Sequence, residues 1–389
     1  MRGSTAPPRR PHPADSIIPM ISHKRYIFLL VLAASFVQAA DPPDTLITAN
    51  GEKLIGHLVR AKGGSVTFHS DTLGDITIDW AKVKELTSSH KFAVIPKNVV
   101  LKYKATDEDG IVHGAVSMAD QKIAVTPAPG QPAKEVATKD TGNVIDQAAF
   151  DAALNRGGNF LKYWTGTITG GVALVESTQN SDTFTGTVHL VRTMPLEDWL
   201  SPSNRTSVNF SAAYGKIDQP NTPTVKTEIL HFDFERDEYF QRRVYGFGIA
   251  AFDHNFSQGL DLQQTYGGGI GWTVVQSDRQ TLDLKASMNY QSQHFEAAAS
   301  NQNLIGSAFT ELYRRKLPLG IQFNEQLTVT PAWNNTNAYS AVGTAGLTMP
   351  VYKRLSLAIN ATDNFLNDPP PMFKKNSFQF TTGITYSLR

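Results

Sequence analysis

The chain has 389 residues, with 36 Lys and Arg, 35 Asp and Glu, and no Cys. This composition excludes a disulfide-stapled domain and a Cys-based metal site, and the absence of a basic block argues against a nucleic-acid partner. A hydrophobic content of 41% is ordinary for a soluble protein. It also fits a transmembrane β-barrel, because half of each spanning strand is polar.

Residues 1–39 are expected to be a secretory signal peptide. Lys24 and Arg25 precede the apolar stretch 26–37, and Val37 and Ala39 occupy the small-residue positions of a cleavage site. A membrane anchor is disfavoured, because a spanning helix needs roughly 20 apolar residues. Met20 is an alternative true start of the chain. Removing 1–39 takes away five basic residues and one acidic residue, namely Arg2, Arg9, Arg10, Lys24, Arg25 and Asp15. The formal charge of the chain therefore falls from +1 by 4 to −3.

Residues 44–125 are expected to form a small periplasmic β-barrel domain of the SH3 or Sm type, with five or six strands. Asn50-Gly51 lies between two alternating segments, which is the strongest short-range signal for a hairpin. Residues 126–143 are rich in Pro, Ala, Gly and Thr, and therefore predict a flexible linker. Residues 144–158 predict a short helix that ends near Arg156-Gly157-Gly158.

From residue 160 to 389 the sequence predicts an all-β fold, a transmembrane antiparallel β-barrel of about 12 strands. The segments alternate apolar and polar residues, as strands with one apolar face do: 163–175, 182–193, 204–216, 224–235, 242–253, 261–275, 279–291, 302–314, 319–330, 337–348, 353–363 and 376–388. No later stretch approaches 18 consecutive apolar residues, and only helices and closed barrels span lipid.

The polar face favours a barrel over a soluble sandwich, because it carries Ser, Thr, Asn, Gln and Gly rather than many Lys and Glu. In the last strand, Phe378, Phe380, Ile384, Tyr386 and Leu388 are predicted to face lipid. Asp283 and Lys285 are predicted to point into the lumen. Aromatic residues near segment ends predict interfacial girdles: Tyr163, Trp164, Phe184, Tyr245, Trp272, Tyr290, Tyr313, Phe323, Phe380 and Tyr386.

Alternate connections are short, as at 236–241, 276–278, 316–318 and 350–352, whereas the others are mostly longer. The connection at 194–203 is a long exception in the short set. This asymmetry predicts periplasmic termini, with the short turns on the same side. The expected location is the outer membrane of a Gram-negative envelope.

The run 231–272 resembles the YdiY-like salt-induced outer membrane proteins, a domain of unknown function. The resemblance rests on Asp233–Tyr239, Tyr245-Gly246, Asp253–Leu262 and Gly267–Trp272, which follow in the family's order. Residues 163–190 look like the family's first hairpin, and the N-terminal β-domain is similar to one attached to some larger members. The resemblance implies a porin-like barrel and its location, but no activity.

The sequence predicts no catalytic, cofactor-binding or metal-binding residues, and no enzyme. His254 and His294 are expected in loops, and no G-x-S-x-G motif occurs. The acidic segment 233–238 is interpreted as a solvated turn in preference to a calcium site. The "DEDG" at 107–110 is interpreted as a hairpin turn. The Gly-rich segment 267–271 is expected to thin the lumen lining or permit curvature.

The predicted function is therefore a structural or passive-pore barrel of the outer membrane; the alternative is an envelope enzyme such as a lipid hydrolase that uses His294. Expected partners are the lipid bilayer, the barrel-assembly machinery, and periplasmic proteins or peptidoglycan through 44–125. Thr382, Gly383, Tyr386 and Leu388 resemble the C-terminal assembly signal of bacterial barrels, although Arg389 follows where a terminal aromatic residue is usual.

Overall fold

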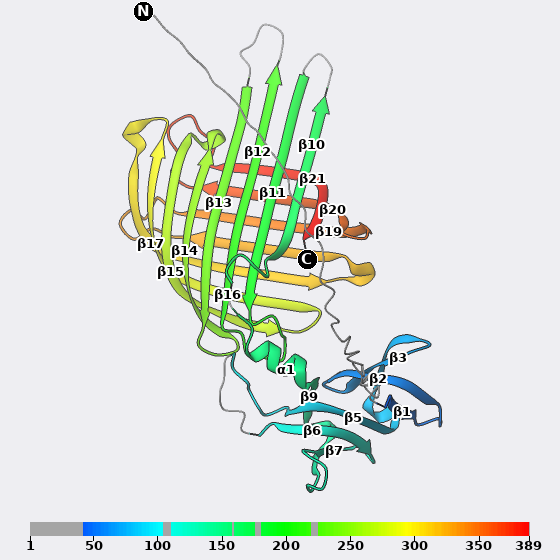
Figure 1. The fold of residues 1–389 in the computed structure, drawn as a ribbon. Coiled ribbons are helices and arrows are strands. Elements are labelled where there is room, and N and C mark those ends of the chain that lie inside the picture. Colours follow the sequence, from blue (N-terminus) through cyan, green and yellow to red (C-terminus); the bar gives the residue numbers. More distant parts are fainter. Residues whose placement is uncertain (1–41, 104–109, 158, 176–179, 219–224, 389) are drawn as a thin grey trace, which may run out of the picture. The chain divides into compact units, whose positions relative to one another are not determined.

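The computed structural model describes residues 42–103, 110–157, 159–175, 180–218 and 225–388. The predicted signal peptide lies outside this part of the chain, as does most of the "DEDG" segment. The described residues form a nine-stranded sheet followed by a closed twelve-stranded barrel (Figure 1). No helix among them is long and apolar enough to cross a membrane.

The N-terminal sheet consists of nine short antiparallel strands and is followed by one helix. The strands are β1 (Asp44–Thr48), β2 (Lys53–Lys62), β3 (Ser65–Ser70), β4 (Gly74–Asp79), β5 (Val83–Pro96), β6 (Val112–Ala119), β7 (Lys122–Thr126), β8 (Lys134–Ala137) and β9 (Thr141–Asp146), and the helix is α1 (Gln147–Leu154). Strand β1 pairs with β2 and β5, and β9 pairs with the same two strands, so the sheet curls into a barrel-like unit. Its core includes Leu46, Phe68, Leu86, Phe92 and Ile123.

The predicted linker 126–143 is wrong over much of its length. β8 pairs with β7, and β9 returns to the sheet beside β2 and β5. The β9 residue Val144 is fully buried in the core, and the strand continues to Asp146, so α1 begins only at Gln147. Asp146 caps the helix by accepting the amide of Ala149 at 3.0 Å.

The barrel runs in simple order from β10 to β21, and the two ends of the series pair with each other. Its strands are β10 (Thr165–Val175), β11 (Asn180–Met194), β12 (Asn204–Asp218), β13 (Val225–Tyr239), β14 (Val244–Asn255), β15 (Leu260–Gln276), β16 (Gln280–Phe295), β17 (Gln302–Lys316), β18 (Gln322–Thr330), β19 (Ser340–Tyr352), β20 (Leu355–Leu366) and β21 (Asn376–Leu388). The predicted fold class and the twelve strands are confirmed. Single 3₁₀ turns occur at 80–82, 138–140, 256–258, 298–300 and 318–320.

The barrel wall has an apolar outer face and a polar inner face. Ile270, Met288 and Phe380 expose 61%, 63% and 65% of their surface on the outside. On the inside, Asn289 and Thr385 are buried, because they face the interior of a closed wall. The lipid-facing assignment of Phe378, Phe380, Ile384 and Tyr386 agrees with their exposed outer position.

The predicted position of Tyr245 in the aromatic girdle is wrong. It is fully buried on the inner face, whereas Phe184, Trp272 and Tyr290 are exposed outside. Strand β14 begins at Val244, so Tyr245 takes the inward position that alternates with Gly246. Its ring fits there because Gly271 on β15 has no side chain: a Cβ at Gly271 would lie 2.3 Å from the Tyr245 ring.

The long turn between β11 and β12 has a packing role. Trp199 stacks on Phe150 of α1, with ring centroids 5.3 Å apart, and Leu200 belongs to the same buried cluster. Apolar residues that pack in this way need a longer connection than a tight hairpin provides. This explains why residues 195–203 depart from the short turns at 240–243, 277–279 and 353–354.

Candidate functional site

The barrel encloses a cavity of about 620 Å³ that is lined mainly by hydroxyl, amide and charged side chains. Thr187, Ser207, Asn209, Thr310 and Thr328 are typical of the lining. Asp283 and Lys285 both line it, which confirms their predicted inward direction. The charged residues that line it are four carboxylates and three bases: Asp233, Glu235, Asp253, Asp283, Arg205, Lys285 and Arg314.

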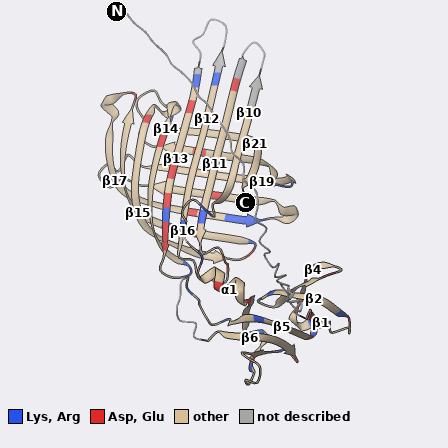
Figure 2. Cartoon of the chain, in the orientation of Figure 1, with Lys and Arg blue, Asp and Glu red and all other residues tan. Residues whose placement is uncertain are grey.

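Strand β13 supplies an acidic ladder to the lumen. Asp233, Glu235 and Asp237 follow one another at every second residue and are buried at 9%, 7% and 0% exposure. Figure 2 shows acidic residues recurring along β13, whereas most of the barrel wall carries no charge. The interpretation of 233–238 as a solvated turn is therefore wrong, because β13 continues through it to Tyr239.

A charged cluster joins three strands near the end of β13. The Nε of Arg205 on β12 donates to Asp237 Oδ2 at 2.5 Å, and its Nη1 donates to Asp283 Oδ2 on β16 at 3.3 Å. Arg205 also lies over the Tyr245 ring, 5.1 Å from its centroid. Strands β13 and β16 are separated by β14 and β15, so the cluster bridges parts of the wall that are not neighbours.

A second bridge joins β16 to β13 beside the first. Lys285 Nζ on β16 donates to Glu235 Oε1 on β13, and both side chains are less than 10% exposed. The Lys285 ammonium also lies 5.1 Å from the Phe247 ring centroid. Together the two bridges define a charged constriction, formed by Arg205, Glu235, Asp237, Asp283 and Lys285.

The glycines of the Gly-rich segment of β15 leave space for the side chains of the charged constriction. Gly267, Gly269 and Gly271 face inward, and a Cβ at Gly269 would lie 2.0 Å from the Ala286 carbonyl oxygen. A Cβ at Gly267 would lie 2.1 Å from the Asn289 side chain. The absence of side chains lets β14, β15 and β16 pack closely, so that residues of β13 and β16 reach each other. This agrees with the expected role of 267–271 in thinning the lining.

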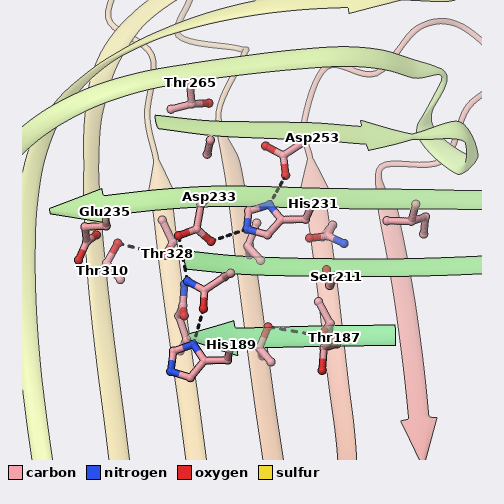
Figure 3. A pocket seen from close by; sticks show the side chains of 18 of the residues that line it. Thr187, His189, Ser211, His231, Asp233, Glu235, Asp253, Thr265, Thr310 and Thr328 are labelled. Atoms are coloured by element: carbon pink, nitrogen blue, oxygen red, sulfur yellow. Dashed lines mark hydrogen bonds and ion pairs between the residues drawn. The ribbon is translucent and has the colours of Figure 1, made fainter. Parts of the chain in front are cut away.

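A histidine cluster lies next to the constriction (Figure 3). His231 Nδ1 lies 2.6 Å from Asp253 Oδ1, and its Nε2 lies 2.9 Å from Asp233 Oδ2. Asp233 Oδ1 accepts the Asn209 amide at 2.9 Å, and Asn209 Oδ1 contacts His189 Nδ1. Because carboxylates occupy both nitrogens of His231, neither nitrogen is available to activate a nucleophile in this arrangement.

The histidines that the sequence singled out lie in strands, not in loops. His254 belongs to β14, and its Nδ1 contacts the Asp261 carbonyl oxygen at 2.7 Å. His294 belongs to β16 and is exposed, with Ser292 Oγ 3.4 Å from its Nε2. That distance is at the weak limit of a hydrogen bond.

The four predicted assembly residues lie on β21, the strand that closes the barrel. Tyr386 pairs with Ile168, and Leu388 pairs with Gly166, both of β10. Thr169 and Thr385 hydroxyls lie 2.7 Å apart across this seam. A Cβ at Gly383 would lie 2.6 Å from the Gly170 carbonyl oxygen, so glycine is needed for the strands to approach.

Only some of the lumen residues could be predicted from the sequence. Alternation identified Asp283 and Lys285, because their strand has a regular period of two. It missed Asp233, Glu235 and Asp237, because clustered acids resemble a solvated turn. The available signal was the alternation of these three acids with Phe232 and Phe234, which puts the acids on one face of a strand.

A closed antiparallel barrel with an apolar exterior and a charged polar lumen is thus the class that the fold and the site define. The chain belongs to the DUF481 family, described as proteins of unknown function, which matches residues 169–388. No curated protein matches the chain.

Several solved outer-membrane barrels resemble the chain. An outer membrane channel from Pseudomonas putida F1 has a TM-score of 0.36 at 9% identity, covering 59% of this chain and 99% of that one. The NanC porin has a TM-score of 0.34 at 7% identity, covering 58% and 100%. The translocator domain of the autotransporter NalP from Neisseria meningitidis has a TM-score of 0.29 at 12% identity, covering 57% and 87%.

Proposed function

We propose that the protein is an outer-membrane β-barrel that forms a narrow passive pore. The observation that carries this proposal is the barrel wall itself, which is closed, apolar outside and polar inside. A closed barrel satisfies its backbone hydrogen bonds internally, which lipid requires of any spanning structure. Strands of 9–17 residues are long enough for a tilted crossing, which takes about 9–11 residues.

The charged constriction sets the expected pore properties. Its ion pairs join β16 to β12 and to β13, and their side chains occupy space on the lumen side of the wall. The nearly balanced charges of the lining favour weak ion selectivity. The proposed traffic is therefore limited to small polar solutes and ions.

Planar-bilayer conductance of the refolded full chain tests the pore. We expect small conductance steps from the wild type and larger steps from R205A/D237A/D283A, which removes one bridge. The matched control is R236A/E238A, which removes an ion pair of 2.6 Å whose side chains are 36% and 56% exposed. No steps in any variant at any voltage would refute the pore and leave a purely structural barrel.

A periplasmic position is proposed for the N-terminal sheet. Gly166 pairs with Leu388, so the start of β10 and the end of β21 lie at the same end of the barrel. The short turns lie at this end too, and short turns are periplasmic in outer-membrane barrels. The sheet would then be available to periplasmic proteins or peptidoglycan.

The last strand is proposed to act as the signal that the barrel-assembly machinery reads. Thr382, Gly383, Tyr386 and Leu388 all belong to the strand that completes the seam with β10. Deleting residues 380–389 should leave the exported protein unassembled in the periplasm. Normal membrane insertion of this truncation would rule out the proposal.

A lipid hydrolase is the competing function, and the Ser292–His294 pair on the exposed side of β16 is the observation behind it. It predicts acyl-ester hydrolysis by the wild type that disappears in H294A. We expect no hydrolysis by the wild type, because 3.4 Å between Ser292 Oγ and His294 Nε2 is at the weak limit of a hydrogen bond. Turnover that His294→Ala abolishes would overturn the pore assignment in favour of the enzyme.

A further inference from the structure

Three metal-ligating side chains converge at the start of the N-terminal sheet. Asp44 on β1, His57 on β2 and His90 on β5 each offer one ligand atom, and these atoms lie within 4.8 Å of one another. Strand β1 pairs with both β2 and β5, so the topology brings the three side chains together from separate parts of the chain. We propose that these residues bind a divalent cation of the zinc class.

The spacing of the ligand atoms fits a small tetrahedral ion. Asp44 Oδ1 and His90 Nδ1 are 3.2 Å apart. Two ligand atoms at the usual zinc distances of about 2.0–2.1 Å lie about 3.3 Å apart in a tetrahedron. The rings of His57 and His90 are 5.8 Å apart and inclined at 73°. The ligand atoms lie within 4.8 Å of one another, and His57 is exposed, so its side chain has room to turn toward the other two.

The surrounding backbone holds the carboxylate in place. Asp44 is only 1% exposed, and its Oδ2 accepts the Leu58 amide at 2.7 Å. This hydrogen bond leaves Oδ1 directed at His90, which is how an outer partner orients a metal ligand. A cation beside Oδ1 would also offset the cost of burying a carboxylate.

Backbone irregularities on the two flanking strands position the histidines. The β5–β6 register shifts between Ser88 and Lys91, so His90 lies in a bulge, and its amide donates to Ser88 Oγ at 3.2 Å. The β2–β3 register shifts directly after Leu58, next to His57. Bulges commonly redirect a side chain at a functional site.

The donor set selects the class of ion. Two imidazoles and one carboxylate suit zinc and its neighbours in the transition series, whereas Mg²⁺ and Ca²⁺ prefer oxygen ligands alone. Three protein ligands leave a fourth position for water or for a donor from another molecule. Because the ligands come from three strands, the ion would also join the first strand of the sheet to both its neighbours.

Zinc titration of the chelator-treated, refolded full chain by calorimetry tests the proposal. We expect one Zn²⁺ per chain, with affinity reduced on the order of tenfold or more in H57Q and in H90Q, since even outer-shell changes cost about that much. D44N should weaken binding similarly, while its amide oxygen still accepts the Leu58 amide. Mg²⁺ and Ca²⁺ should not compete at equal concentration.

The matched control is H294Q. His294 is another exposed histidine, and it lies on β16 of the barrel, outside the cluster. Its loss should leave the zinc affinity unchanged. No zinc binding by the wild type, or equal affinity in wild type and H57Q, would overturn the proposal. The exposed position of His57 makes H57Q the variant least able to disturb folding.

Discussion

At the scale of single residues, the lumen is organised by buried charges that pair between strands of the barrel wall, several of which are not neighbours. Lys285 and Glu235 are nearly inaccessible and hold each other from strands that do not pair. Such a pair adds little net stability compared with apolar residues, but breaking it leaves one buried charge uncompensated. The geometry of the constriction therefore depends on both partners being present.

The Lys285–Glu235 bridge gives a stability prediction. K285M should lower the free energy of unfolding by about 3–5 kcal/mol, because Glu235 is left buried without its partner. K285M/E235L should recover most of this loss, because an apolar pair replaces the ionic one. Urea unfolding of the protein in lipid vesicles measures both. If K285M were as stable as the wild type, Glu235 would be solvated and not buried.

These residue-level features mark the limit of sequence reasoning. Alternation assigns Asp283 and Lys285 to the lumen without naming their partners, which lie some fifty to eighty residues away in the chain. Tyr245 was predicted to lie at the membrane interface, and only the packing against Gly271 explains why it is buried. The metal-ligand cluster was missed for a similar reason, since Asp44, His57 and His90 have no characteristic spacing.

At the scale of elements, the regular strands were predictable and the irregular ones were not. The twelve predicted barrel segments agree with β10–β21, and many of them, such as β12, β16 and β18, have a clear period of two. β8 and β9 escaped detection because they are short and their surroundings are rich in Pro, Gly and Thr. Tertiary pairing with β2, β5 and β7 makes them strands despite this composition.

The seam between β10 and β21 gives a prediction at this scale. G383A should reduce the fraction of folded barrel, because the new Cβ meets the Gly170 carbonyl oxygen at 2.6 Å. Overpacking of this kind costs about 1–3 kcal/mol. The control is G186A, because a Cβ at Gly186 meets nothing within 4 Å. Heat-dependent gel migration measures the folded fraction, and equal folding of the two variants would contradict the seam geometry.

At the scale of the whole molecule, the chain combines two β-units whose apolar residues lie on opposite sides of their sheets. The N-terminal sheet has an internal apolar core, as a water-soluble domain does. The barrel places its apolar residues outside and its charges inside, which is the reverse arrangement. This inversion lets a chain of ordinary hydrophobic content present an apolar surface suited to the proposed position in a membrane.

The central claim is that the barrel folds in the outer membrane with its apolar face in lipid. The most direct test is gel migration of the full chain extracted from the outer-membrane fraction, with and without boiling. We predict that the unboiled protein stays compact and migrates faster than the boiled protein. Recovery in the soluble periplasmic fraction, with no shift on boiling, would contradict the account.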